Sequence, residues 1–131
     1  MRDKFIITGI ILVATAIMLG AFGAHGLKKV VDETAVHTFE VGVKYQTYQG
    51  LGFLVLASLV SGFNFELTSI FRLLLIGTLL FSLSIYALVL LPIVHIDLKM
   101  VFGPITPIGG LLMIIGWLLL LVKFLKNRPN E

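Results

Sequence analysis

Four long apolar stretches separated by short polar connections make up most of the chain. The first runs from Phe5 to Ala24, 20 residues in which only Thr8 and Thr15 are polar. As a helix rising about 1.5 Å per residue, it would reach roughly 30 Å, the thickness of a bilayer's hydrocarbon core. A signal peptide is the competing interpretation, but its apolar core would be unusually long, and more apolar stretches follow. The pattern therefore predicts a membrane-spanning helix at about 5–25.

Three further stretches without a charged residue follow, at 45–65, 73–94 and 100–122. Because proline is well tolerated in the first turn of a helix, Pro104 and Pro107 place the start of the last span near Thr106. Trp117 would then lie within the bilayer, where its indole N–H needs an acceptor on a neighbouring helix. The predicted spans are about 5–25, 45–65, 72–93 and 106–123.

A mixed segment at 26–44 connects the first two spans. Val36, Phe39 and Val43 recur at spacings of three and four, which places them on one face of a helix, and charged residues lie between them. Asp32, just before this pattern, is the predicted N-cap. The segment therefore predicts an amphipathic helix that lies in the membrane interface and bends into the second span.

Composition agrees with a membrane location. Of the 131 residues, 58% are hydrophobic and 13% are charged, and the mean hydropathy is +1.05. This is more apolar surface than a water-soluble domain can bury, and the even spacing of the stretches offers no domain boundary. We expect one integral membrane domain over 1–131: an all-α, four-helix transmembrane bundle with an amphipathic interfacial helix between spans one and two.

The basic residues indicate orientation, and no nucleic-acid partner is expected. The net charge is +3 and the pI is near 9.4, but the lysines and arginines flank the apolar stretches. Four spans place both termini on one side, with six basic residues there and four on the other side. They are Arg2, Lys4, Arg72, Lys123, Lys126 and Arg128, against Lys28, Lys29, Lys44 and Lys99. This narrow excess favours a multi-pass cell-membrane protein with cytoplasmic termini, and insertion in both orientations stays open.

Most polar side chains away from the termini fall within 20–52. The candidate polar cluster consists of His25, His37, Glu40, Lys44, Tyr45, Gln46 and Gln49. Its tyrosine and glutamines begin the second span, where aromatic and amide groups favour the headgroup level. One interpretation makes the cluster a binding or proton-handling surface. The other is structural, with Glu40 and Lys44 forming an i,i+4 ion pair as the helix enters the bilayer.

Residues for catalysis or metal binding are scarce. Cysteine is absent, which excludes disulfides and thiolate metal sites. Three histidines and two acids are expected to lie on one side of the membrane, but their spacing in the sequence is not typical of a metal site. They are His25, His37, Glu40, His95 and Asp97. Phosphate-loop and hydrolase motifs are absent and no charge interrupts the spans, so we expect no enzyme, no metal, no cofactor and no usual secondary transporter.

Small residues predict close packing between helices. Gly20, Gly23 and Gly26 recur every three residues at the end of the first span, and further glycines lie in the second and fourth spans. The two glutamines of the second span would add hydrogen bonds between helices. His25, at the end of the first span, is expected to cap its last carbonyls.

Several segments together resemble a known family. They are Gly20-Ala21-Phe22-Gly23-Ala24-His25-Gly26-Leu27, Tyr45-Gln46-x-Tyr48, Ser82-x-Ser84-Ile85-Tyr86, and Ile105-Thr106-Pro107-Ile108-Gly109-Gly110 with Gly116-Trp117. In order and spacing they are similar to the YgdD/YwdK family of small membrane proteins, also called domain of unknown function 423. The resemblance implies a four-span protein of the cell membrane, with relatives in bacteria and eukaryotes, and no established activity. Gln49 stands where a histidine is expected, and Leu83 stands where a glycine is expected.

The expected function is a structural or accessory role in membrane organisation or in a membrane complex. Abundant small-residue packing without catalytic or ion-coupling residues favours it. Membrane lipids are the expected partners, together with a second copy or another membrane protein, because four short helices leave much lipid-facing surface. The alternative is a small channel or carrier whose polar mouth is formed by the 20–52 stretch.

Overall fold

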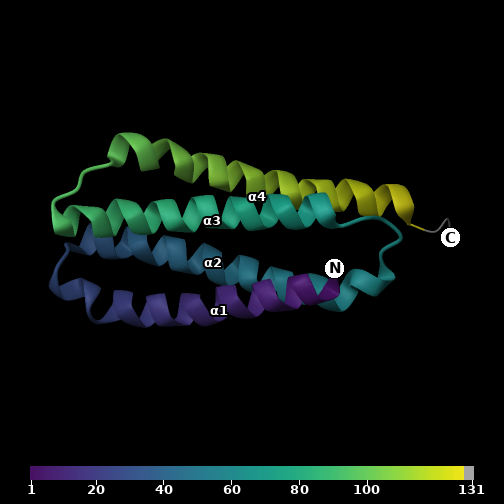
Figure 1. Cartoon of the computed structure of the whole chain (residues 1–131), viewed down its shortest axis with the longest axis horizontal. Helices are drawn as coiled ribbons and strands as arrows, with labels where there is room; N and C mark the ends of the chain where they lie inside the picture. The colour runs from purple at the N-terminus through teal and green to yellow at the C-terminus, as the bar shows by residue number, and fades with distance from the viewer. Residues whose placement is uncertain (129–131) are drawn as a thin grey trace.

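Over residues 1–128, the part of the chain that the computed structural model describes, four helices run up and down in succession. They are α1 (Arg2–Ala24), α2 (Glu33–Leu59), α3 (Thr68–Leu90) and α4 (Lys99–Asn127). Short 3₁₀ turns follow the first three: η1 (Leu27–Lys29), η2 (Val60–Gly62) and η3 (Leu91–Val94). α1 packs mainly on α2 and α3 mainly on α4, with a smaller contact between α2 and α3, and both termini lie toward the same end of the bundle (Figure 1). The predicted all-α fold is confirmed.

Within the described residues, three segments are long and apolar enough to cross a bilayer. They are Arg2–Lys29, Thr68–Val94 and Lys99–Asn127, and the most apolar 18 residues of each have mean hydropathies of 2.5, 2.5 and 2.4. Only 22%, 44% and 17% of their most apolar parts are buried, so many of their apolar side chains face outward. Such faces are suited to contact with acyl chains. Three candidate spans agree with the predicted multi-pass membrane protein, and α2 is not among them.

The segment expected to form a separate interfacial helix is the first part of α2. Glu33–Leu59 is one helix of 27 residues, so the expected boundary near residue 45 is absent, and the helix ends before the predicted limit at 65. Asp32 is the N-cap, as predicted, and its carboxylate accepts a 2.7 Å hydrogen bond from the Ala35 N–H. Gly42, at the expected bend, is covered by Ile85 and Tyr86 of α3, so packing supports a continuous helix there.

The predicted start of the last helix near Thr106 is wrong, because α4 begins at Lys99 and contains both Pro104 and Pro107. Each proline removes one backbone N–H from the helix, but membrane helices tolerate this where neighbouring groups support the backbone. The Thr106 hydroxyl lies 3.5 Å from the Phe102 carbonyl and 2.6 Å from the Ser84 hydroxyl on α3. This contact with α3 supports the turn that contains the prolines.

Glycines form the closest contacts between neighbouring helices. A Cβ on Gly50 of α2 would lie 2.9 Å from Val13 Cγ2 on α1, and a Cβ on Gly77 of α3 would lie 2.8 Å from the Met113 N of α4. A Cβ on Gly109 would meet the backbone N of Phe81. These approaches leave no room for a side chain, so both helix pairs pack backbone to backbone. The predicted packing role of the glycines is confirmed at Gly50 and Gly109.

Two apolar clusters lie toward opposite ends of the bundle. Near the termini, the rings of Phe5, Phe53 and Phe71 join α1, α2 and α3, with centroids 5.1 to 5.6 Å apart. Toward the other end, Leu27 and Phe39 pack with residues near the end of α3. Between the clusters, the helices are connected by hydrogen-bonded polar side chains.

Candidate functional site

Gln46 connects three helices in the interior of the bundle. Its side chain is 5% exposed. Its amide nitrogen donates hydrogen bonds of 3.0 Å to the Leu12 carbonyl and 2.7 Å to the Thr15 hydroxyl on α1. Its amide oxygen accepts a 2.7 Å hydrogen bond from the Tyr86 hydroxyl on α3. Gln46 therefore bridges α1 and α3 through α2.

Other polar side chains make similar bridges, and together with Gln46 they form what we call the polar layer. Ser82 of α3 donates a 2.9 Å hydrogen bond to the Gly42 carbonyl of α2. The Trp117 indole N–H of α4 donates a 3.3 Å bond to Gln49 Oε1 of α2, which confirms the predicted need for an acceptor. Within residues 1–128, every buried side-chain nitrogen or oxygen has a hydrogen-bond partner. The polar layer is thus satisfied by the protein itself.

The hydrogen bonds of Gln46 fix its level along α1. Gln46 bonds to Leu12 and Thr15, which occupy the middle of the apolar stretch from Phe5 to Ala24. At about 1.5 Å per residue, both lie roughly 10 Å or more from either end of that stretch. Gln46 is therefore level with the middle of the apolar stretch of α1, and not with either of its ends.

The charged members of the predicted cluster do not join the polar layer. Of the seven cluster residues, only Gln46 and Gln49 are buried. The exposed members are His25, His37, Glu40, Lys44 and Tyr45. His25 is the C-cap of α1, and its backbone N–H, rather than its side chain, bonds to the Phe22 carbonyl at 3.3 Å.

One face of α2 carries a row of exposed polar side chains. The row, which we call the α2 polar stripe, consists of His37, Glu40, Lys44 and Tyr48. Spacings of three and four residues place them on the same side of the helix. The stripe points away from the polar layer, because all four residues are exposed and Gln46 and Gln49 are buried.

The structure does not gather the side chains considered for a metal site. Within residues 1–128, no group of three or more histidine, aspartate or glutamate side chains is close enough to hold a metal ion. The residues considered were His25, His37, Glu40, His95 and Asp97.

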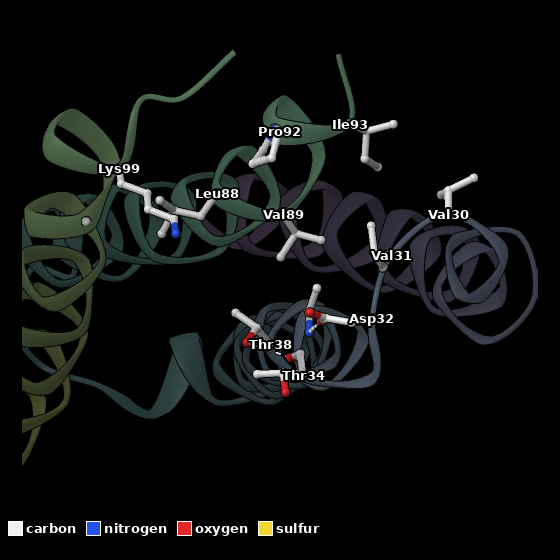
Figure 2. A pocket seen from close by; sticks show the side chains of 12 residues that line it. Val30, Val31, Asp32, Thr34, Thr38, Leu88, Val89, Pro92, Ile93 and Lys99 are labelled. Atoms are coloured by element: carbon white, nitrogen blue, oxygen red, sulfur yellow. Dashed lines mark hydrogen bonds between the residues drawn. The ribbon is translucent and has the colours of Figure 1, made fainter. Parts of the chain in front are cut away.

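A groove of about 700 Å³ opens at the end of the bundle where α4 begins (Figure 2). Its walls come from the start of α2, the end of α3 with η3, and the start of α4. We call it the end groove, and its lining consists of Val30, Val31, Asp32, Thr34, Ala35, Thr38, Leu88, Val89, Pro92, Ile93, Lys99 and Gly103. Figure 2 shows Lys99 on the α4 side of the hollow and Asp32 on the α2 side. One base and one acid therefore lie on separate walls among mostly apolar neighbours.

The sequence pattern did not predict that Thr15, Ser82 and Tyr86 bond to the α2 backbone and Gln46, nor that Lys99 lines a groove. The available signal was the presence of polar side chains within apolar stretches, since such a side chain needs a partner inside a membrane protein. That signal does not say which helix supplies the partner. The partner depends on the register between helices.

Helices with apolar outer faces and a self-satisfied polar layer define a polytopic α-helical membrane protein. The family described as "Protein of unknown function (DUF423)" matches residues 19–110. The UPF0382 membrane protein YwdK of Bacillus subtilis is 38% identical over 125 residues, which cover 93% of this chain and 96% of YwdK. A UPF0382 membrane protein of Staphylococcus haemolyticus is 37% identical over 122 residues, which cover 93% of this chain and 95% of the relative.

This chain belongs to the DUF423/UPF0382 family of membrane proteins, which confirms the expected resemblance. A UPF0382 membrane protein of Staphylococcus epidermidis shows a similar 38% identity over 122 residues, covering 93% of this chain and 95% of the relative. No solved structure matches the chain.

Proposed function

We propose that the protein is a non-enzymatic structural component of the cell membrane that works as a homo-oligomer assembled through α2. The observation that carries this proposal is the α2 polar stripe, whose Lys44 and Tyr48 are exposed alongside the apolar stretch of α1, where lipid would otherwise surround them. Polar side chains in that position are costly unless another protein surface covers them.

Contacts with α1 determine the depth of the stripe. A Cβ on Gly20 would lie 3.4 Å from Val43 Cγ1, and Gln46 bonds to Thr15 at 2.7 Å. Lys44 therefore lies level with the part of α1 between Thr15 and Gly20, roughly 6–14 Å inside the end of the apolar stretch.

Tyr48 lies deeper than Lys44. Its neighbours in the chain on either side, Gln46 and Gly50, contact α1 at Leu12, Val13 and Thr15. Tyr48 is 56% exposed. Tyrosine usually prefers the membrane interface, so this exposed position near mid-depth favours a covered surface.

The charges of the stripe are complementary to a second copy of the same surface. Two α2 helices related by a two-fold axis along the membrane normal run parallel, so Glu40 of each copy is offset along the helix by about 6 Å from Lys44 of the other, a distance that the long lysine side chain can span. Leu51 and Val55 extend the same face toward the other end of α2 and are 49% and 57% exposed, so they add an apolar contact. An acid and a base that pair away from water cost less than either one alone in lipid.

The proposal places all four helices across the bilayer, with both termini in the cytoplasm. Antiparallel packing of α2 along α1 supports α2 as the second crossing. The basic residues support the orientation, since six flank the terminal side and four the other side.

Cross-linking tests the oligomer directly, because the natural chain has no cysteine. Lys44→Cys and Tyr48→Cys probe the stripe, and Ile10→Cys and Leu118→Cys are controls on the outer faces of α1 and α4, where the native residues are 54% and 55% exposed. Oxidation in native membranes is expected to link the stripe variants into dimers and to leave the controls monomeric. Three results would contradict the homo-oligomer proposal. The stripe variants could stay monomeric, link no better than the controls, or link to a different protein.

The second candidate, a small channel or carrier with a mouth in the 20–52 stretch, is tested by flux. The buried glutamines of that stretch bond to α1, α3 and α4, which favours the structural role. Purified protein in liposomes is expected to move no protons, ions or small solutes above the level of empty liposomes. Flux that is lost in His25→Ala or Glu40→Ala would replace the structural proposal with the carrier.

A further inference from the structure

We propose that the end groove binds the headgroup of a zwitterionic phospholipid with a primary amine, of the phosphatidylethanolamine class. The inference goes beyond the proposed function and does not depend on the homo-oligomer. It rests on three properties of the groove: its level in the membrane, its apolar walls, and the acid and base on opposite sides.

The end groove lies at the boundary between the apolar stretches and the polar connections. The apolar stretch of α3 ends at Val94 and that of α4 begins at Met100, and the charged connection between them includes Asp97 and Lys99. The groove is lined by the residues just inside that boundary on both helices. In a bilayer this is the headgroup level, where the phosphate and glycerol of a lipid lie.

The walls suit the apolar part of a lipid. Leu88, Val89, Pro92 and Ile93 form the side made by α3 and η3, and Val30 and Val31 continue the surface toward α2 (Figure 2). A hollow of about 700 Å³ has the size of a small-molecule site. The glycerol of one phospholipid and the parts of its acyl chains next to the glycerol therefore have an apolar surface to contact.

Lys99 suits the phosphate of the headgroup. Lys99 is the first residue of α4, and its side chain lies on one side of the groove (Figure 2). Its ammonium group carries three N–H donors. Hydrogen bonds between an ammonium and a phosphate are charge-assisted and therefore stronger than neutral ones.

Asp32 suits the amine of the same headgroup. Its carboxylate already accepts the N-cap hydrogen bond from the Ala35 N–H at 2.7 Å. A carboxylate has about four acceptor positions, so that single bond leaves capacity for the donors of an ammonium group. The Thr34 hydroxyl lines the groove beside it.

The charges of the groove distinguish between lipid classes. The lining contains one acid and one base, which match the ammonium and the phosphate of phosphatidylethanolamine. The quaternary ammonium of phosphatidylcholine has no N–H to donate to Asp32. Phosphatidylglycerol has no cation, so it leaves Asp32 without a counter-charge beside an anionic lipid.

The test measures which lipid stays bound to the intact protein. Purified full-length protein is equilibrated with equal amounts of phosphatidylethanolamine, phosphatidylcholine and phosphatidylglycerol that carry the same acyl chains, and retained lipid is identified by native mass spectrometry. Retention of phosphatidylethanolamine is expected to exceed that of each other lipid by about threefold or more, as for a partly solvated charge pair.

Two substitutions each remove one charge from the groove and are expected to leave the fold intact. Asp32→Asn keeps an equally good N-cap, so a loss of preference reports the charge and not the helix. Lys99→Gln keeps the length of the side chain nearly unchanged. Asp32→Asn is expected to abolish the preference for phosphatidylethanolamine. Lys99→Gln is expected to lower the retention of all three lipids, because all three carry the phosphate. Lys28→Gln and Glu33→Gln, which change charges outside the groove lining, are expected to leave both retention and preference intact.

Several results would overturn the proposal. They are equal retention of the three lipids, a preference for phosphatidylglycerol, or an equal loss in the control variants. Removal of the preference by millimolar inorganic phosphate would show a site for free phosphate and not for a lipid. A preference that persists in Asp32→Asn, or retention that is unchanged in Lys99→Gln, would place the lipid elsewhere on the protein.

Discussion

The Tyr86 hydroxyl of α3 donates a 2.7 Å hydrogen bond to Gln46 Oε1 of α2, in the interior of the bundle. The amide nitrogen of Gln46 donates hydrogen bonds to the Leu12 carbonyl and the Thr15 hydroxyl of α1. One glutamine side chain therefore connects three helices. Since acyl chains offer no competing hydrogen-bond partner, these bonds favour one rotation of α2 relative to its neighbours.

The Gln46–Tyr86 pair is expected to be energetically coupled. In a double-mutant cycle with Gln46→Leu and Tyr86→Phe, we expect a coupling of about 0.6 kcal/mol and at most about 1.7 kcal/mol, the range for hydrogen bonds between membrane helices. The free energy of unfolding in mixed micelles gives the measurement. Gln49→Leu combined with Tyr86→Phe is the control and should be additive, because Gln49 bonds to Trp117 instead. Additivity in both cycles would contradict the bridge.

Two adjacent glycines are expected to respond differently to alanine. A Cβ on Gly109 meets the backbone N of Phe81, whereas a Cβ on Gly110 lies 3.6 Å from the Phe81 ring, an ordinary contact. Gly109→Ala should lower the free energy of unfolding by about 1–3 kcal/mol through overpacking. Gly110→Ala should change it by less than about 0.5 kcal/mol. Equal effects in the same unfolding assay would show that α3 and α4 do not approach at Gly109.

Trp117 is expected to report the integrity of its bond to Gln49. It is the single tryptophan of the chain, so its indole N–H proton is one resolved signal in an NMR spectrum. Gln49→Leu removes the acceptor that lies 3.3 Å from the indole nitrogen, so the signal should move upfield and its hydrogen exchange should speed up. Gln46→Leu, one turn away, should leave that signal near its native position. A signal unchanged by Gln49→Leu would exclude the bond.

The N-cap of α2 is expected to depend on the Asp32 side chain. Asp32→Ala removes the acceptor of the Ala35 N–H and should destabilise the first turn of α2 by about 1 kcal/mol. Faster hydrogen exchange at the Ala35 amide is the measurement. Asp32→Asn should restore slow exchange, because asparagine caps equally well. Fast exchange in both variants would mean that the charge of Asp32, and not its cap, holds this turn.

Local patterns in the sequence determined the number and type of the helices. Charge-free stretches long enough to span a bilayer predict helices, because a backbone surrounded by lipid must satisfy its own hydrogen bonds. The cap at Asp32 was predictable for a similar reason, since it depends on residues next to each other in the chain. The need of Trp117 for an acceptor followed from its predicted position within the bilayer, although its partner did not.

Tertiary structure alone decided which residues meet and how deep they lie. The depth of Gln46 depends on the antiparallel register of α1 and α2, which is set where Gly50 lets α2 approach Leu12 and Val13. α4 begins at Lys99 and not near Thr106, and the contact of Thr106 with Ser84 of α3 in the turn that contains the prolines is not visible in the local preference of proline for a first turn. Asp32 and Lys99 line one groove because the start of α2 and the start of α4 lie at the same end of the bundle. Local residue patterns specify each helix, but contacts between distant residues specify how the helices pack.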